Sequence, residues 1–129
     1  MHDQPSILEL VEAVRDFLET KAMPQLEGRA AFHARVSANA LGIVERQLAL
    51  GPKQAADEIE RLKKLLGRDD TLDELNRALC SAIREGEIGL ESPGLADHLW
   101  ETTLAKVAVD QPKYATYQKT VREYGDGHP

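Results

Sequence analysis

Apolar residues recur every three or four positions along most of the chain, which is the spacing of one face of an α-helix. The first run of such residues comprises Ile7, Leu10, Val11, Val14, Phe17 and Leu18. Just before it, Ser6 and Glu9 match the S-x-x-E capping box, in which each side chain accepts a hydrogen bond from the other's backbone N–H. Pro24 should end the helix near Ala22, because the residue before a proline is driven out of helical geometry.

A second helix is predicted over residues 28–50, with Gly51 as its stop. Its larger apolar side chains, with one alanine, form one broad arc: Phe32, Val36, Ala40, Ile43, Val44 and Leu48. Small residues recur four apart on the other side: Ala30, Ala34, Ala38 and Gly42. This pattern is typical of a helix covered on both sides, so we predict that it is the central helix of the fold. The alternative is that these four small residues, which we call the small ridge, form the interface of a homodimer.

Three more helices follow from the same reasoning. Pro52 is suited to the first turn of a third helix, whose apolar positions are Ala55, Ile59, Leu62 and Leu66. Thr71 and Glu74 form a second capping box, before a fourth helix with Leu72, Leu75, Leu79 and Ile83 on one side. Ser92 and Pro93 should begin a fifth helix, which carries Leu95, Leu99, Leu104 and Val107 and ends near Asp110.

These patterns predict an all-α fold, a bundle of five helices with short loops around the helix of residues 28–50. No alternating strand pattern of useful length is present. We expect one bundle domain over residues 3–112. Residues 113–129 form a tail that is predicted to be partly helical, as a sixth short helix, or disordered, and the final GDGHP should be frayed.

The composition narrows the classes of function. The net charge is −6, so a protein that binds DNA or RNA by neutralising phosphates is disfavoured. A single cysteine, Cys80, cannot form an intrachain disulfide, and the start of the chain does not have the pattern of a signal peptide. No apolar run approaches the roughly 20 residues of a membrane helix. We expect a cytoplasmic protein that binds neither nucleic acid nor membrane.

Polar residues within the apolar stripes are the first candidates for chemistry. His33 and Asn39 lie among the large residues of the second helix, and Asn76 lies in the stripe of the fourth. We predict that they form an internal hydrogen-bond network. The alternative is a ligand pocket, in which Arg29 at the helix N-terminus joins His33 and Asn39 and attracts an anionic ligand.

Evidence for a catalytic or metal centre is weaker. Asp97, His98 and Glu101 offer metal-binding groups within one helical turn, but no matching ligand motif occurs elsewhere in the chain. Cys80 flanks an apolar stripe, which is typical of a packing residue. Ser37 lies one turn from His33, but two residues do not make a triad. We therefore expect no cofactor and no metal, and we expect the chain not to be an enzyme.

The tail contains three tyrosines, Tyr114, Tyr117 and Tyr124, which would share one face of a helix. They have two interpretations. They could pack back on the bundle, or they could form an aromatic surface for a partner protein.

Three segments together resemble a known family. They are DQPSILELVEAVRDFLE (residues 3–19), AFHARVSANALGIVERQLALG (residues 31–51) and KVAVDQPKY (residues 106–114). The similarity is to a bacterial family of small helical domains of unknown function, whose members are encoded beside, or fused to, aminoglycoside-phosphotransferase-like kinases. Acyl-CoA dehydrogenase genes also occur nearby.

The resemblance implies an accessory role beside one of these enzymes. The first hypothesis is therefore a non-catalytic interaction module that partners a phosphotransferase-like kinase or an acyl-CoA dehydrogenase. The second is a helical bundle that binds or transforms an acyl-CoA or a phosphorylated ligand near Arg29 and His33. The third is self-association through the small ridge of the second helix.

Overall fold

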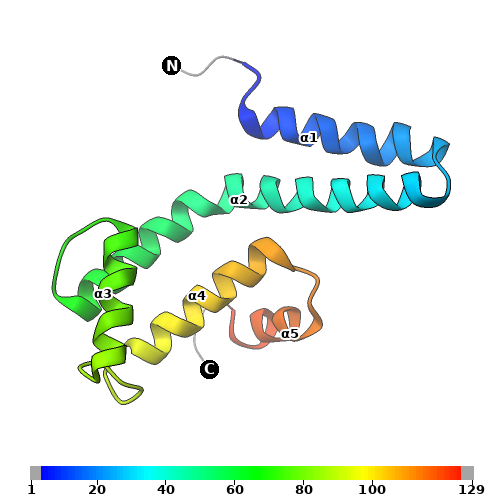
Figure 1. The fold of residues 1–129 in the computed structure, drawn as a ribbon. Helices are drawn as coiled ribbons and strands as arrows, with labels where there is room; N and C mark the ends of the chain where they lie inside the picture. Colours follow the sequence, from blue (N-terminus) through cyan, green and yellow to red (C-terminus); the bar gives the residue numbers. More distant parts are fainter. Residues whose placement is uncertain (1–3, 126–129) are drawn as a thin grey trace. The chain divides into compact units, whose positions relative to one another are not determined.

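The computed structural model describes residues 4–125, and all regular secondary structure in that part of the chain is helical (Figure 1). The predicted all-α class is confirmed. The helices are α1 (Ile7–Phe17), α2 (Gly28–Leu66), α3 (Leu72–Glu85), α4 (Leu95–Asp110) and α5 (Ala115–Tyr124). Between α1 and α2 the chain forms a π-helical segment (Leu18–Ala22) and a short 3-10 helix (Met23–Gln25). The predicted fraying of GDGHP falls on residues 125–129, of which only Gly125 is described.

The chain divides into two compact units, residues 1–51 and residues 52–129. The boundary falls inside α2, between Gly51 and Pro52. The prediction of a single domain over residues 3–112 stays a prediction.

The predicted stop of the second helix at Gly51 is wrong, because one continuous α2 contains both Gly51 and Pro52. A glycine ends a helix when it adopts a positive φ, and Gly51 does not. The Gln47 side chain instead lies where a Cβ of Gly51 would be. Pro52 removes one backbone donor within the helix, a cost of about 3 kcal/mol that neighbouring helical residues can offset. The predicted second and third helices are therefore one element.

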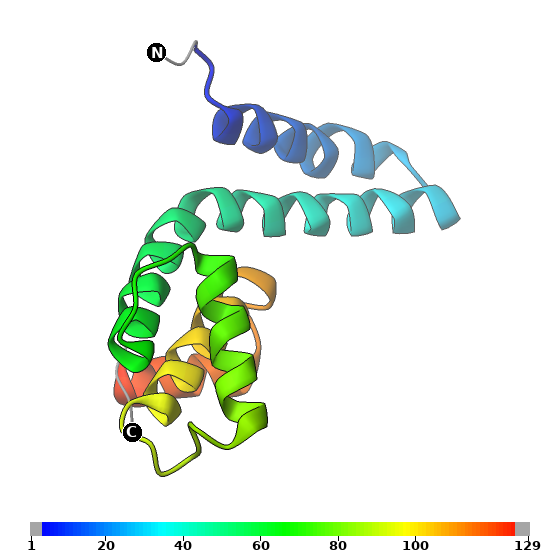
Figure 2. The ribbon, with the colours of Figure 1, turned by 60° about the vertical axis from the view of Figure 1, so that its left-hand side comes forward.

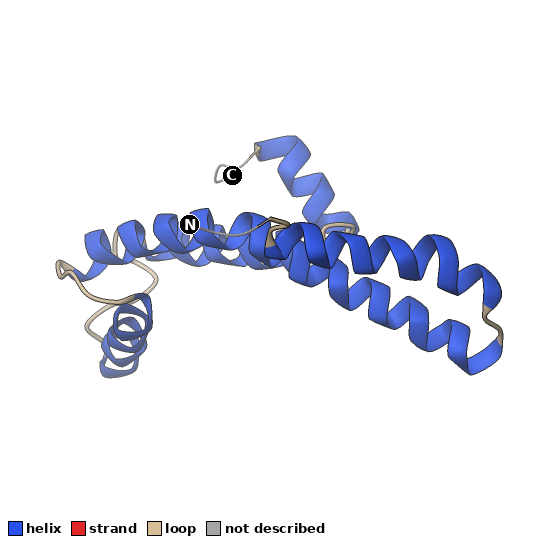
Figure 3. Ribbon diagram, turned by 90° about the horizontal axis from the view of Figure 1, so that it is seen from above, coloured by secondary structure: helices blue, strands red, loops and turns tan. Residues whose placement is uncertain are grey.

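The first unit is a helical hairpin. α1 and the first part of α2 run antiparallel and lie side by side in three views (Figures 1, 2 and 3). Both halves of the predicted capping box are formed. The Glu9 backbone N–H donates to Ser6 Oγ at 3.3 Å, and the Ser6 N–H donates to the Glu9 carboxylate at 2.7 Å. Regular α-helix ends at Phe17, and Pro24 lies in the 3-10 turn that leads into α2.

The second unit contains a core of leucines. Leu62 of α2, Leu75 and Leu79 of α3, and Leu95 of α4 are buried against one another. Burying a leucine side chain fully contributes about 1.5–3 kcal/mol, so these four side chains are the main hydrophobic stabilisation of this unit. The helices α4 and α5 are in contact.

Two turns in the second unit differ in how well they were predicted. At the start of α3, Thr71 Oγ1 accepts from the Glu74 N–H at 3.3 Å, as the capping box predicts, and Asp70 accepts from the Thr71 N–H at 2.9 Å. The predicted start of the fifth helix at Ser92 and Pro93 is wrong. Helix α4 begins only at Leu95, because Ser92 Oγ is used within the turn, where it accepts from the Gly89 N–H at 2.9 Å.

Candidate interaction surface

The small residues of α2 lie on the inner side of the hairpin. Ala34 and Ala38 are buried, as is Gly42, where an added Cβ would lie 3.5 Å from Arg15 Nη1 of α1. Ala30, the first residue of the predicted ridge, is exposed. The ridge therefore lets α1 approach α2 closely within one chain. The alternative, that the ridge is a homodimer seam, stays a prediction.

One ion pair joins the two helices of the hairpin. Arg15 Nη1 of α1 donates to a carboxylate oxygen of Glu45 of α2, and Arg15 Nε also donates to Glu19 at 3.2 Å. The hydrogen bond to Glu45 raises the pKa of Arg15, and that to Glu19 raises it further. Both partners are partly shielded from water, which strengthens the attraction relative to a fully solvated pair. The pair fixes the register of α1 along α2.

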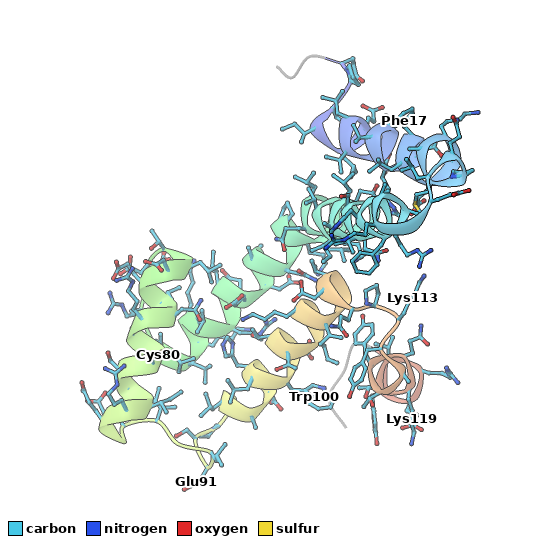
Figure 4. The ribbon with its side chains drawn as sticks, turned by 45° about the vertical axis from the view of Figure 1, so that its right-hand side comes forward. Phe17, Cys80, Glu91, Trp100, Lys113 and Lys119 are labelled. Carbon is cyan, nitrogen blue, oxygen red and sulfur yellow. The ribbon has the colours of Figure 1, made fainter. Side chains whose placement is uncertain are left out.

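The outer side of α1 carries an exposed apolar stripe. Ile7, Leu10, Val14 and Phe17 follow one another at spacings of three and four residues, and each side chain is between 52% and 68% exposed. Phe17 is labelled on α1 in Figure 4. No charged residue of α1 falls within this stripe, so the face is suited to contact with another apolar surface.

The outer side of α2 in the same unit is also apolar and exposed. Its exposed side chains are Phe32, Val36, Ile43, Val44 and Leu48, at 37% to 60%. The prediction that this helix is covered on both sides is therefore wrong within the first unit, since only its small-residue side is covered. Periodicity marks a face as apolar, but it does not tell whether the cover comes from the same chain.

We name these nine exposed side chains the hairpin surface: Ile7, Leu10, Val14 and Phe17 of α1, and Phe32, Val36, Ile43, Val44 and Leu48 of α2. At their observed exposures they present on the order of 400 Å² of apolar area on each of the two helices, using typical side-chain areas. Monomeric soluble proteins rarely expose contiguous apolar patches larger than a few hundred Å². This area marks the hairpin as the candidate site for association with another protein.

The three predicted ligand-binding residues lie on α2 of the first unit, and all are exposed: Arg29, His33 and Asn39. The internal network predicted for His33 and Asn39 is wrong, because both residues are exposed and their polar atoms need no protein partner. The His33 ring packs edge-on against Phe32, with 5.5 Å between ring centroids. Binding of a ligand by Arg29, His33 and Asn39 stays a prediction.

The second unit does contain hydrogen bonds between polar side chains of different helices. The Asn76 amide of α3 donates to Glu58 of α2 at 3.0 Å and to the Leu72 carbonyl at 3.1 Å. Arg61 of α2 lies 3.4 Å from Thr102 Oγ1 of α4. The prediction that Asn76 makes internal hydrogen bonds is confirmed. Its side-chain partner is Glu58 of α2 rather than His33 or Asn39.

His98 of α4 is buried, with only 2% of its surface exposed. Burial lowers the pKa of His98 and the nearby positive charge of Arg61 lowers it further, while Glu58 acts in the opposite direction. Its Nδ1 has no hydrogen-bond partner. The predicted stripe of this helix was partly wrong, because Leu99 is 44% exposed and His98 lies on the buried side. The sequence does contain a signal for the burial of His98, because His98 lies three residues after the buried Leu95, on the same helical face.

Other candidate residues of the second unit are dispersed. Asp97 is exposed whereas His98 is buried, so they do not share a side of α4. Within residues 4–125, no three His, Cys, Asp or Glu side chains gather as a metal site requires. Cys80, expected to be a packing residue, is exposed on α3 (Figure 4).

The tail tyrosines lie on and beside α5. Tyr114 is the N-cap of the helix and Tyr124 is its last residue; both are exposed, whereas Tyr117 is half-buried. We name these three residues the tyrosine surface. Their role as an interface stays a prediction.

A family model for a domain of unknown function, DUF6285, matches residues 24–114, which is well over half of the chain. The chain belongs to the DUF6285 family. The DUF6285 match includes all of α2, α3 and α4 and ends at Tyr114, so α1 and α5 lie outside it. No curated protein and no solved structure matches this DUF6285 protein. Among the described helices of this DUF6285 chain, none combines the length and the apolar character that crossing a membrane requires.

Proposed function

We propose that this chain is a non-catalytic accessory module whose role is to bind other proteins. The observation that carries the proposal is the hairpin surface, where two adjacent helices expose large apolar side chains in place of a core. Water contact with that area is unfavourable by about 25 cal/mol per Å². Covering it with protein supplies the free energy for association.

The partner follows from the family resemblance, which implies a bacterial setting beside an aminoglycoside-phosphotransferase-like kinase; the composition of the chain adds the expectation of a cytoplasmic location. An acyl-CoA dehydrogenase is the other enzyme that the resemblance implies. We assign the docking of the kinase to the hairpin surface and to the tyrosine surface, since exposed aromatic side chains such as tyrosine are enriched at protein interfaces. A tyrosine supplies a large apolar contact and a hydroxyl at little cost in conformational entropy.

Co-expression with the neighbouring kinase, followed by size-exclusion chromatography, tests this function. We expect the two proteins to elute together at micromolar concentration. Replacing Tyr114 and Tyr124 together by serine should weaken the complex at least tenfold. Gln118→Ser, on the exposed side of the same helix, is the matched control and should leave the complex unchanged. Separate elution of the unmodified proteins would count against the kinase as a partner.

A further inference from the structure

A group of polar side chains lies between α2 and α4 in the second unit. At one end of this contact, the Gln54 amide donates to the Ala105 carbonyl at 3.0 Å. At the other end, a Cβ added to Gly94 would lie 3.4 Å from Leu65. The order of these contacts shows that the two helices run antiparallel. His98 is one turn after Gly94 and two turns before Ala105, so it lies on the side of α4 that faces α2.

Arg61 of α2 lies opposite this part of α4. Its Nη2 is 3.4 Å from Thr102 Oγ1, one turn after His98, and its positive charge acts on His98. Among residues 4–125 Arg61 forms no ion pair, and its Nε is buried without a hydrogen-bond partner. Charges that are shielded from water are normally paired. Arg61 therefore has no contacting carboxylate to offset a second positive charge beside it.

Both charges that act on His98 come from α2, while α3 contributes an uncharged amide. They are Arg61 and Glu58, which are one turn apart. The Glu58 carboxylate accepts a hydrogen bond from the Asn76 amide of α3 at 3.0 Å. Burial and the charge of Arg61 oppose a proton on His98, and Glu58 favours one.

We propose that the contact between α2 and α4 is a pH-sensitive switch, in which proton binding by His98 releases α4 from α2. His98 is only 2% exposed, and its Nδ1 has no hydrogen-bond partner. A proton on this ring adds a buried positive charge beside Arg61 and leaves an N–H donor without an acceptor. Release of α4 gives both groups access to water. This inference goes beyond the proposed function and does not rest on it.

The closed contact is favoured at neutral pH because α4 also contributes to the leucine core. Leu95 of α4 is buried against Leu62 of α2, so its exposure on release is unfavourable. In the closed state, burial and the charge of Arg61 lower the pKa of His98 below its ordinary value of 6.5. In the released state the ordinary pKa returns, so this state binds the proton more tightly. The closed contact should therefore be fully stable above about pH 7 and should weaken as the pH falls through 6.5 toward the lowered pKa.

Trp100, the one tryptophan of the chain, lies two residues after His98 on α4, and its fluorescence reports on this helix (Figure 4). Urea titrations of the full chain between about pH 7.5 and about pH 5.5, followed by this fluorescence, give the equilibrium constant for opening. We expect the constant to rise as the pH falls, and we expect His98→Leu to abolish the rise. A constant for His98→Leu that rises as steeply as that of the unmodified chain would overturn the proposal.

Two further variants test the electrostatic origin of the switch. Arg61→Gln removes the positive charge beside His98, so the rise should be smaller than in the unmodified chain. Glu58→Gln removes the negative charge but keeps an acceptor for Asn76, so the rise should be larger. Arg77→Gln, in an exposed ion pair of α3, is the matched control and should leave the rise unchanged.

The change with pH separates the switch from a folding defect, because a general loss of stability multiplies the constant by the same factor at every pH. If Arg61→Gln and Glu58→Gln both leave the rise as it is in the unmodified chain, their charges do not act through His98 and the proposal is wrong.

Hydrogen exchange distinguishes release of α4 from unfolding of the whole chain. After correction for the intrinsic effect of pH on exchange, the amides of residues 98–109 should lose protection at about pH 5.5, whereas those of α1 should not. Equal protection of α4 at the two pH values, or an equal loss of protection in α1 and α4, would contradict the proposal.

Discussion

Arg15 of α1 donates a hydrogen bond to Glu45 of α2, across 30 positions of the sequence, and this pair joins the two helices of the hairpin. Both side chains are partly buried, so their interaction should exceed that of an exposed pair. A double-mutant cycle with Arg15→Leu and Glu45→Leu should give a coupling energy of about 1 kcal/mol in urea unfolding.

The exposed pair of Arg77 and Asp73 on α3 is the control for this cycle, and its coupling should be about 0.3 kcal/mol. Equal coupling energies for the two pairs would show that partial burial does not strengthen the bond between α1 and α2.

Overpacking the inner side of the hairpin should destabilise the fold. Ala38 is 2% exposed, so Ala38→Leu must push α1 away from α2, at a cost of about 1–3 kcal/mol. Ala30→Leu, at the exposed end of the same four-residue repeat, should change the free energy of unfolding by less than about 0.5 kcal/mol. Thermal unfolding of the two variants checks this. If Ala38→Leu leaves the melting temperature unchanged, the ridge does not contact α1.

The buried His98 predicts a pH dependence of stability. Its pKa in the folded chain lies below the ordinary value of 6.5, so the unfolded chain binds the proton more tightly. Stability should therefore be complete above about pH 7 and should fall as the pH drops through 6.5 toward the lowered folded pKa. His98→Leu should remove this slope from denaturation curves at pH 5 to 7. His33→Leu, at an exposed histidine, should retain it.

Two asparagines with the same predicted role should respond differently to substitution. Asn76 bonds Glu58 and the Leu72 carbonyl, so Asn76→Ala should cost about 1–2 kcal/mol in stability. Asn39 is exposed, and Asn39→Ala should cost less than about 0.5 kcal/mol. The difference is measured in parallel urea titrations. Equal costs would mean that the amide of Asn76 makes no net contribution.

The elements whose signals are local were predicted correctly from the sequence. The capping residues Ser6 and Thr71 depend only on residues within one turn, and both cap their helices as expected. The reciprocal half of the box forms at Glu9 but not at Glu74, because Asp70 accepts from the Thr71 N–H instead. Gly51 and Pro52 misled the prediction because a stop signal depends on the backbone angle that the glycine adopts, which the sequence does not state.

Burial was harder to predict than helix content. The amphipathic pattern identified the apolar face of α2, but a pattern cannot tell whether the covering partner belongs to the same chain. His33 and His98 illustrate the difficulty: His33 lies in a more apolar stripe, yet His98 is the buried histidine. Their exposure depends on which helices of the same unit pack beside them, which is decided by contacts far apart in sequence.

The central claim is that protein covers the outer side of α1, and hydrogen exchange of α1 measures this directly. In the presence of the kinase, the amides of residues 10–17 should exchange more slowly than in the free chain, since a bound protein stabilises the helix that it covers. In Val14→Glu the kinase should not slow the exchange. Exchange in α1 of the unmodified chain that the bound kinase leaves unchanged would contradict the account.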